Sequence, residues 1–225
     1  MNLSLTTFNR LGYLTQSVSS LMNTSFTVPT TLRIFDDHSE DPMVLELFKS
    51  IPKIQNLEME FYTNTRNLGC DLNVNQAIKK SFEFCDDKFV VVLDSDGLYN
   101  PNWLSFLNRK INELQDEKIA AISIFDTPSH EVIDKYDEDL NEKRNVGGFA
   151  VAINRDVYDK VDPNVILEGH DTFCWDWQFI KRSEEMNYKR LCSKKSYAQH
   201  IGAYGVHSNG SKFDFANNFT YEGDI

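Results

Sequence analysis

Residues 89–97 read FVVVLDSDG, an apolar run that ends abruptly in two aspartates one residue apart. Such a short, continuous apolar run is typical of a buried strand. Side chains at positions i and i+2 of a strand point the same way, so Asp94 and Asp96 can converge on one cation just beyond the strand. Mg²⁺ and Mn²⁺ bind carboxylate oxygens and share their remaining positions with water and substrate phosphate. The pattern indicates a metal site, and a plain turn, which Asp and Gly also favour, is the alternative.

Strand-like and helix-like segments alternate through the first hundred residues. The predicted strands span residues 3–8, 31–35, 57–62 and 89–93, and the predicted helices span 11–21, 45–49 and 71–84. This alternation predicts an α/β fold with a mostly parallel central sheet flanked by helices. Ligands of such sheets bind beyond the carboxyl ends of the strands. The pairs Asn9-Arg10, Asp36-Asp37 and Asp94-Asp96 follow three of these ends, so we expect them at one edge.

The second half of the chain has a less regular pattern. It predicts strands over 119–125 and 149–153 and helices over 155–161 and 176–186. Residues 127–145 are charged without a clear period, which predicts a loop or a lid. Nothing in the composition resembles a linker, so the sequence predicts a single domain over residues 1–225.

Composition excludes several classes of protein. With 41% hydrophobic and 12% aromatic residues, the chain is predicted to be globular rather than disordered. A formal net charge of −11 disfavours broad binding to a phosphate backbone. The four cysteines lack the CxxC spacing of a zinc site or a disulfide framework. No apolar run is long enough to cross a bilayer and the start lacks a signal peptide, so we expect a cytoplasmic protein.

Several short segments, taken in order, carry a family resemblance. They are TTFNR at 6–10, DDHSED at 36–41, NLG at 67–69, NQA at 75–77, DSDG at 94–97 and YNPNW at 99–103. Together they resemble the family 2 glycosyltransferases that use nucleotide sugars, and the resemblance covers most of the chain. It implies one GT-A-like domain, with a nucleotide-sugar-binding half over 1–105 and an acceptor and catalytic half over 106–225.

The resemblance implies a set of donor contacts. They are Thr6, Thr7, Asn9, Arg10, Asp36, Asp37, Arg66, Asn67, Gly69, Ser95, Gly148 and Trp175. The side chains of residues 6–10 can hydrogen-bond a base or phosphates, although this turn can equally cap the next helix. The acidic pair of the second loop can accept hydrogen bonds from a base or ribose, although Asx-turns are an alternative. Glycine allows close backbone approach, and tryptophan either stacks on a sugar or packs in the core.

Sugar transfer needs a base to deprotonate the acceptor hydroxyl and a cation to take up charge on the departing diphosphate. The segment WDWQFIKR at 175–182 resembles the family helix that opens with this base, which implies that role for Asp176. Trp175 departs from the commoner Glu, and Asp171 is the rival base. A helix N-cap is the structural alternative for Asp176.

The resemblance also suggests a third metal ligand. His200 lies where some relatives have a metal-binding histidine, and imidazole suits Mn²⁺ better than Mg²⁺. The expected cofactor is therefore Mn²⁺ or Mg²⁺ on Asp94, Asp96 and His200. Residues 208–225 are predicted to form a loop that closes over the donor.

The sequence thus predicts a metal-dependent, inverting glycosyltransferase. A nucleotide-diphosphate sugar, with UDP-sugars the commonest family choice, would donate to the hydroxyl of an acceptor such as a glycan. A hydroxylated base of phage DNA is an alternative acceptor, which the acidic charge disfavours. A nucleotidyltransferase and a non-catalytic sugar-binding domain are alternatives of other classes. The first of these normally has a glycine-rich phosphate loop, and residues 6–10 contain no glycine.

Overall fold

The strand that carries the acidic pair lies inside a nine-stranded sheet. The structure, a computed structural model, describes residues 1–115, 117–204 and 214–222. In order across the sheet the strands are β3 (Leu57–Thr63), β2 (Thr30–Asp36), β1 (Asn2–Thr7), β4 (Phe89–Asp94), β9 (Val151–Asn154), β6 (Ile119–Ser123), β10 (Lys189–Ser193), β8 (Leu140–Lys143) and β7 (Val132–Lys135). A separate pair joins β5 (Gly97–Tyr99) to β11 (Ala198–His200).

The sheet is parallel in its first half and mixed in its second. β3, β2, β1 and β4 run parallel to one another. β9 then lies antiparallel between β4 and β6, and β10 returns parallel to β6. The parallel half brings the carboxyl ends of β1, β2 and β4 to one edge, because the register pairs Thr6 with Asp94 and Thr7 with Asp36.

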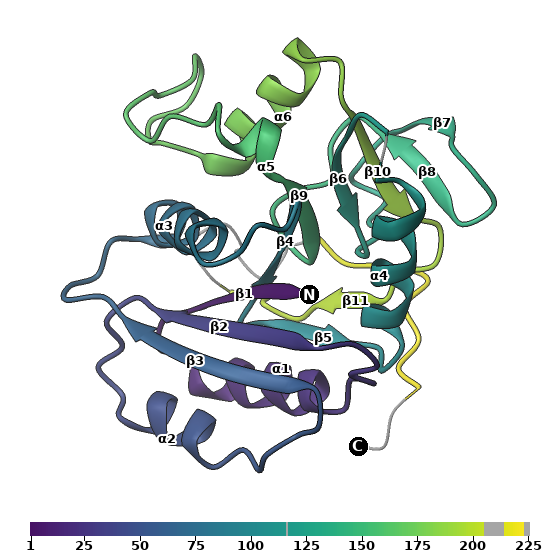
Figure 1. Cartoon of the computed structure of the whole chain (residues 1–225). Coiled ribbons are helices and arrows are strands. Elements are labelled where there is room, and N and C mark those ends of the chain that lie inside the picture. Colours follow the sequence, from purple (N-terminus) through teal and green to yellow (C-terminus); the bar gives the residue numbers. More distant parts are fainter. Residues whose placement is uncertain (116, 205–213, 223–225) are drawn as a thin grey trace.

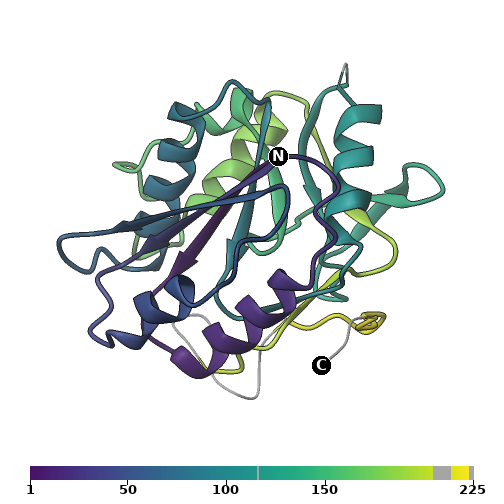
Figure 2. The ribbon, with the colours of Figure 1, turned by 60° about the horizontal axis from the view of Figure 1, so that its bottom comes forward.

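Helices cover both faces of this sheet. α1 (Leu11–Met22), α2 (Met43–Lys49) and α4 (Trp103–Glu113) share one hydrophobic core with it. α3 (Cys70–Glu83), α5 (Arg155–Tyr158) and α6 (Trp175–Glu185) share a second core. Figure 1 shows α1 and α2 below strands β2 and β3 with α3 above them, and Figure 2 brings α1 and α2 to the front. Among the described residues, no helix is long and apolar enough to cross a membrane.

Strand alternation in β4 sets the direction of the first aspartate. The odd-numbered residues of β4 belong to the core shared with α1 and α4. Val90 and Val92 belong to the core shared with α3 and α6. Because side chains alternate along a strand, Asp94 continues the set of Val90 and Val92 and lies on the side of α3 and α6.

The predicted elements of the first half are confirmed to within two residues at every end. The single α/β domain with its helix-flanked sheet is confirmed as well. Boundaries differ more in the second half. The helix predicted over 155–161 ends at Tyr158, and the strand predicted over 119–125 ends at Ser123. Sequence patterns locate such ends poorly when the next residues stay apolar.

The prediction of a loop or lid over residues 127–145 is wrong. β7 and β8 form an antiparallel hairpin there, and β8 extends the sheet beyond β10. Every residue of β7 is exposed, so no buried face produces the alternation that marks a strand. The hairpin is fixed by long-range ion pairs, since the buried ammonium of Lys110 in α4 lies 3.0 Å from Asp137 and 2.9 Å from Asp139. A local pattern cannot show such contacts.

Candidate active site

The predicted acidic pair lies at the edge where β1, β2 and β4 end. Asp94 is the last residue of β4, and the Thr6 hydroxyl of β1 donates a 3.3 Å hydrogen bond to its carboxylate. Asp96 and Ser95 form the buried turn that leads into β5. Burial and then the charge of Asp96 raise the pKa of Asp94 to about 7. The pair is therefore a concentrated negative charge in a dry setting, which a cation would relieve.

Both carboxylate oxygens of Asp96 have cationic partners within the protein. Arg10 lies 2.8 Å from Oδ2, and Nε2 of His200 lies 3.5 Å from Oδ1. Burial acts to raise the pKa of Asp96, but His200 and Arg10 together hold it below the usual value. Burial likewise acts to lower the pKa of His200, and its contact with Asp96 outweighs that and raises it. The structure thus brings His200 to the acidic pair, as the sequence predicted.

The β5–β11 pair explains why His200 reaches Asp96 from so far along the chain. His200 stands opposite Gly97 in this antiparallel pair, one residue beyond Asp96. The Ile201 N–H then donates to the Asp96 carbonyl at 2.9 Å. Gly202 follows, and a Cβ placed on it would lie 2.0 Å from Oδ2 of Asp96. Only glycine allows the backbone to pass this close to the carboxylate.

The turn between β1 and α1 positions Arg10. Asn9 and Arg10 have φ values of 50° and 54°, the left-handed region that costs an L-residue about 1–2 kcal/mol. Arg10 donates to Asp96 and to the Tyr204 carbonyl at 2.7 Å, and its guanidinium lies 4.5 Å from the centre of the Tyr13 ring. Asn9 accepts a hydrogen bond from the Glu40 N–H. The side chains of this turn thus face the site and the neighbouring loop, and the structure shows no side-chain cap on α1 among the described residues.

A cavity of about 420 Å³ opens beside this turn. It is lined by Arg10, Leu11, Gly12, Tyr13 and Gln16. Thr7, also predicted as a donor contact, lies behind the turn, and its buried hydroxyl finds no hydrogen-bond partner among the described residues. The N-terminal end of a helix and a guanidinium at the mouth of a cavity both favour an anion such as phosphate.

Asp36 and Asp37, at the end of β2, are buried and accept hydrogen bonds from within the protein. Asp36 accepts from the N–H and the hydroxyl of Ser39. Asp37 accepts from the amide of Asn64 at 2.9 Å and from the backbone N–H groups of Leu68 and Gly69. Both residues therefore hold the loops around the site in shape, Asp36 through a local contact and Asp37 through contacts with a distant loop.

The third predicted segment lies on an exposed loop before α3. Arg66 and Asn67 are exposed, and the Asn67 side chain accepts from the Gly69 N–H. Gly69 is the residue before α3 and has φ of 86°, a conformation that glycine adopts without strain. The loop contributes a guanidinium on the surface and a glycine that starts the helix beside the acidic pair.

Asp176, the predicted base, lies in the first turn of α6 and is half-buried. Its charge is among the influences that raise the pKa of Asp94, so the two carboxylates are electrostatic neighbours. Its carboxylate also accepts the Trp177 N–H at 2.8 Å. The rival base, Asp171, is exposed in the loop that precedes α6. The structure therefore brings Asp176 within electrostatic reach of the metal-site candidates.

The start of α6 is held by two features. The Asp71 carboxylate in the first turn of α3 accepts the Trp175 N–H at 3.2 Å. A Cβ on Gly148 would lie 2.7 Å from the Trp175 ring, so glycine is required where that ring packs. Trp175 is buried, as the packing alternative supposed, and Trp177 is the exposed tryptophan at this helix, with its ring centre 5.6 Å from that of His170.

The site contains two residues that the sequence analysis did not select. Asp71 was seen only as the start of a helix, although an acid in a first turn can cap a neighbouring helix as well as its own. The only feature of the sequence that could have pointed to Gly202 is its position two residues after His200, a candidate site residue. Both roles depend on contacts between distant segments, which are visible only after folding.

The residues of the acidic pair fit a divalent cation that a substrate helps to hold. Among the described residues, no group of three or more His, Cys, Asp or Glu side chains is arranged as a metal cage. Mg²⁺ and Mn²⁺ commonly take one or two carboxylates and complete their coordination with water and substrate phosphates. The paired carboxylates, with the raised pKa of Asp94, are suited to that kind of site.

Comparison with known proteins agrees with this architecture. The sequence model described as "Glycosyl transferase family 2" matches residues 4–132, which is more than half of the chain. A comparison with curated protein sequences finds no match.

Solved structures of glycosyltransferases share the fold. TarS residues 1–349 from S. aureus, in complex with UDP-GlcNAc, gives a TM-score of 0.60 at 17% identity, over 92% of this chain and 62% of TarS. The mannosyltransferase PcManGT from Pyrobaculum calidifontis, in complex with GDP-Man and Mn²⁺, gives a TM-score of 0.58 at 15% identity, over 87% of this chain and 58% of that protein. The chain thus spans about three fifths of the length of the TarS fragment 1–349 and of PcManGT, and 36% of the longer TarS structure.

The matched region runs from β1 to the start of β7 and contains the three polar clusters at the strand ends together with the acidic pair. The fold that the solved structures share covers 87–92% of this chain and therefore extends well beyond residue 132. On this agreement of sequence and architecture, the chain belongs to glycosyl transferase family 2.

Proposed function

We propose that this chain is a metal-dependent, inverting glycosyltransferase that moves a sugar from a nucleotide-diphosphate sugar to an acceptor hydroxyl. The observation that carries the proposal is one constellation. The half-buried Asp94 and the buried Asp96 lie together at the carboxyl edge of the sheet, where Asp96 contacts Arg10 and His200, with Asp176 nearby. Two shared-fold proteins were solved with UDP-GlcNAc and with GDP-Man and Mn²⁺, which supports a nucleotide-sugar donor and a divalent cation.

Mn²⁺ or Mg²⁺ would be held by Asp94 and Asp96. His200, the proposed third ligand, now contacts Asp96 and would have to exchange that contact for the cation, since the described residues show no ready set of three ligands. When bound, the cation supplies positive charge to the diphosphate of the donor as it departs. Arg10 already directs its guanidinium into the same space and can share its contact between Asp96 and a phosphate oxygen. The cavity at the start of α1 is the proposed place for the nucleotide, and a UDP-sugar is the first donor to test.

In the proposed reaction the half-buried Asp176 accepts the proton of the acceptor hydroxyl. The freed oxygen attacks the anomeric carbon of the sugar from the side opposite the diphosphate. One carbon–oxygen bond forms while the bond to the diphosphate oxygen breaks, so the anomeric configuration inverts. The N–H that Trp177 donates fixes the orientation of the Asp176 carboxylate. Asp171 remains the rival base, because it lies on the adjacent loop.

The remaining donor contacts are proposed from their positions around this edge. They are Thr6, Thr7, Asn9, Asp36, Asp37, Arg66, Asn67, Gly69, Ser95, Gly148 and Trp175. Buried members shape the loops and the base helix, and the exposed Arg66 and Asn67 are free to approach a nucleotide. The proposed location is the cytoplasm.

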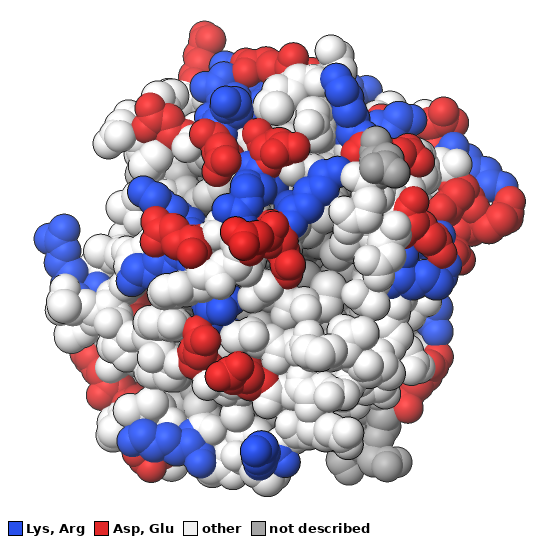
Figure 3. All heavy atoms as spheres, in the orientation of Figure 1, with Lys and Arg blue, Asp and Glu red and all other residues white. Residues whose placement is uncertain are grey.

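Surface charge favours a glycan over DNA as the acceptor. The formal net charge is −11. On the face shown in Figure 3, acidic and basic side chains are interspersed rather than gathered into a broad basic surface. A phosphate backbone is bound through such basic surfaces, so a hydroxylated DNA base is the weaker acceptor hypothesis.

Thermal shift with UDP-GlcNAc and GDP-Man, each with and without Mn²⁺, tests the donor site. A donor at 100 times its Kd stabilises the folded state by about 2.7 kcal/mol, which raises Tm by roughly 5–11 °C in a chain of this size. We expect the shift to require Mn²⁺, to vanish in Asp96→Asn and to persist in Asp86→Asn, the same change at an exposed surface position. An equal shift in Asp96→Asn would contradict the metal site, and no shift with either donor would favour a non-catalytic domain.

A further inference from the structure

A second cavity, of about 290 Å³, lies at the end of β6 beneath the β7–β8 hairpin. Its lining residues are Asp126, Thr127, Pro128, His130, Glu131, Val132, Lys143 and Asn217. Small-molecule pockets usually measure about 300–1,000 Å³, so this cavity suits a ligand near the size of one sugar ring. The residues come from three separate segments of the chain, which the fold assembles around one space.

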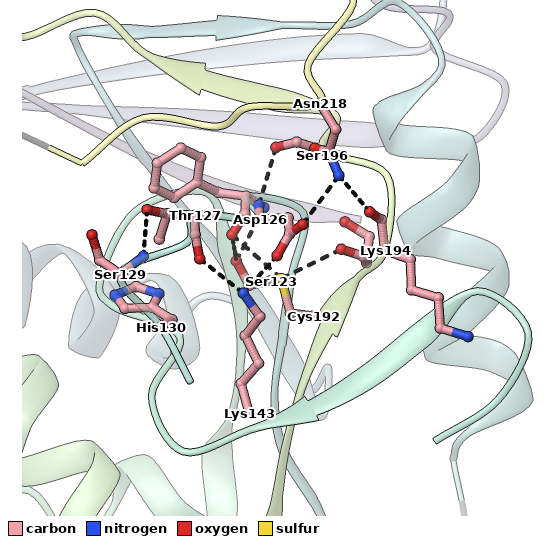
Figure 4. A network of polar contacts seen from close by, with 12 residues as sticks. Ser123, Asp126, Thr127, Ser129, His130, Lys143, Cys192, Lys194, Ser196 and Asn218 are labelled. Carbon is pink, nitrogen blue, oxygen red and sulfur yellow. Dashed lines mark hydrogen bonds and ion pairs between the residues drawn. The ribbon is translucent and has the colours of Figure 1, made fainter. Parts of the chain in front are cut away.

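A buried cation forms one wall of this cavity. The Lys143 side chain is 2% exposed, and its ammonium lies 2.5 Å from Oδ1 of Asp126 and 3.0 Å from the Thr127 carbonyl. Figure 4 shows the Lys143 side chain rising from β8 toward Thr127 and Asp126, with the His130 ring beside it. Because a buried charge needs good partners, this contact fixes the loop that carries Asp126 and Thr127.

The buried imidazole of His130, which has an unpaired ring nitrogen, lies beside this cation in the cavity lining. The His130 side chain is 10% exposed, and its Nδ1 has no hydrogen-bond partner among the described residues. Leaving such an atom unpaired is unfavourable, and a ligand hydroxyl would relieve that cost. Burial lowers the pKa of His130, and Lys143 adds to this while the charges of Asp214 and Asp126 oppose it, so the pKa lies below its usual value and the ring is neutral at neutral pH. A neutral imidazole nitrogen can pair with a hydroxyl as donor or as acceptor.

This cavity borders the proposed catalytic site through two links. Nε2 of His130 lies 4.0 Å from the Asp214 carboxylate, and the Asp214 carbonyl lies 3.3 Å from Nδ1 of His200. On the other side, a Cβ on Gly147 would lie 3.1 Å from His130, and the next residue, Gly148, packs against the start of α6. One wall of the cavity is thus shared with the residues around the acidic pair and the other with the helix of Asp176.

The charges of the lining favour a neutral, hydroxyl-rich ligand. Asp126 and Glu131 supply two negative charges, and Lys143 supplies one positive charge that Asp126 already engages. A phosphate group would meet this net negative lining, whereas sugar hydroxyls both donate and accept hydrogen bonds. Pro128 and Val132 add apolar surface, which suits the C–H face of a sugar ring.

We propose that this cavity is the acceptor subsite and that it takes a neutral sugar or polyol, with hydroxyls held by His130 and Asn217. The identity of the ligand as an acceptor depends on the proposed glycosyltransferase function. Binding of a neutral sugar to the cavity does not, so the two are tested separately.

The test is an NMR titration of the donor-free protein with methyl β-D-glucopyranoside, methyl β-D-galactopyranoside and ribitol, with glucose 6-phosphate as the anionic probe. We expect at least one neutral probe to bind, and to bind more tightly than glucose 6-phosphate. Its Kd should rise about fivefold or more in His130→Phe, which keeps a ring of similar size but removes both nitrogens. Asn217→Ala changes an exposed residue, so it tests the site even if His130→Phe does not fold.

Two controls separate this proposal from the donor site. Asn164→Ala, at an exposed position outside the cavity lining, should bind the neutral probe like the wild type. Asp96→Asn should lose the Mn²⁺-dependent donor shift but keep the binding of the neutral probe. No binding by any neutral probe, tighter binding of glucose 6-phosphate, or a Kd unchanged in both cavity variants would overturn the proposed subsite.

Discussion

Gly202 shows how one residue without a side chain can determine a carboxylate site. Its backbone passes so close to Asp96 that a Cβ would lie 2.0 Å from Oδ2 and 3.0 Å from Nε2 of His200. The same carboxylate carries the Arg10 contact at 2.8 Å. Any larger residue at position 202 must therefore move Asp96 or its partners.

Gly202→Ala is accordingly expected to abolish the Mn²⁺-dependent thermal shift with a bound donor. Its own Tm should fall as well, because overpacking a tight position typically costs about 1–3 kcal/mol. Gly12→Ala is the control for the Tm comparison. Gly12 lies in α1, and a Cβ there would meet no atom within 4 Å. Its Tm should not fall. If Gly202→Ala keeps the full donor-induced thermal shift, the close contact of the Gly202 backbone with Asp96 is not needed for the metal site.

At the level of single residues, a local strand-end pattern pointed to the acidic pair, and the family resemblance pointed to His200 and Asp176; their roles stay predictions. Asp71 and Gly202 escaped, since one acts on α6 from α3 and the other acts by lacking a side chain next to Asp96. For Asp36 and Asp37 the sequence located the residues but did not show the hydrogen bonds that their carboxylates accept within the protein. A motif shows which residue follows a strand, but only the fold shows that Ser39, Leu68 and Gly69 already occupy their oxygens.

Among the elements, the hairpin β7–β8 depends on one buried ammonium in α4. The Lys110 side chain is 4% exposed and lies within 3.0 Å of Glu113, Asp137 and Asp139. Burial acts to lower the pKa of Lys110, but these carboxylates outweigh it and raise it. The hairpin is therefore attached to α4 by charge as well as by Leu140 of β8, which is buried in the core that α4 shares.

Removing that ammonium should destabilise the fold strongly. We expect Lys110→Met to lower the free energy of unfolding by about 1.5–3 kcal/mol, because it removes the charge-assisted hydrogen bonds of the buried ammonium to the partly exposed carboxylates of Asp137 and Asp139. Arg109→Met, the adjacent change on the same helix, removes a half-exposed partner of Glu113 and Asp139 and should cost under about 1 kcal/mol. Urea denaturation of both variants measures the difference, and equal losses would argue against this attachment.

The lowered pKa of Asp137 predicts that the stability contributed by its contact with Lys110 depends on pH. Burial acts to raise its pKa, but hydrogen bonds from Lys110 and from the N–H groups of Asp139 and Leu140 lower it overall. A carboxyl with a lowered folded pKa stabilises the protein above its unfolded pKa of about 3.9, and this is lost as pH falls through the folded value. The stability difference between wild type and Asp137→Asn should therefore be constant from pH 5 to 7 and shrink below about pH 4. A difference that does not change down to pH 3 would contradict the pKa direction.

In the first half, β1, β2 and β4 were predictable because each buries both faces, and the helices because each buries one. β4 is the clearest case, with five apolar residues that fill two cores in alternation. β7 was not predictable, because an exposed edge strand carries no such pattern. β8 was not predicted because it contains Lys143. Sequence patterns assign lysine to the surface, whereas the fold buries Lys143 beside Asp126.

At the scale of the whole molecule, residues 214–222 connect several distant segments. Asn218 accepts a hydrogen bond from the Ser196 N–H and donates to the Lys194 carbonyl and the Asp126 carboxylate. Farther along, the Asn100 amide donates to the Thr220 carbonyl, and Lys195 pairs with Glu222. The expectation of a closing loop over 208–225 falls partly outside the described residues. The described part is fixed against the start of α4 and the loop before β11.

Asn218→Ala should loosen this connection without unfolding the protein. Ser196 is buried, so its N–H would lose its partner, and we expect a loss of about 1–3 kcal/mol. In a chain of this size that lowers Tm by roughly 2–12 °C, at about 2–4 °C per kcal/mol. Hydrogen exchange should show faster exchange at the Ser196 amide. Protection as in the wild type at that amide would rule out this role.

The central claim is that the acidic pair and Asp176 together carry out metal-dependent sugar transfer. The most direct measurement is the Mn²⁺-dependent release of nucleoside diphosphate from a donor that binds, in wild type, Asp176→Asn and Asp171→Asn. The account predicts that Asp176→Asn keeps the donor-induced thermal shift but loses at least about 100-fold in release rate, the usual contribution of a positioned base. Asp171→Asn should retain the release rate of the wild type. Full release by Asp176→Asn, or release that needs no Mn²⁺, would contradict the account.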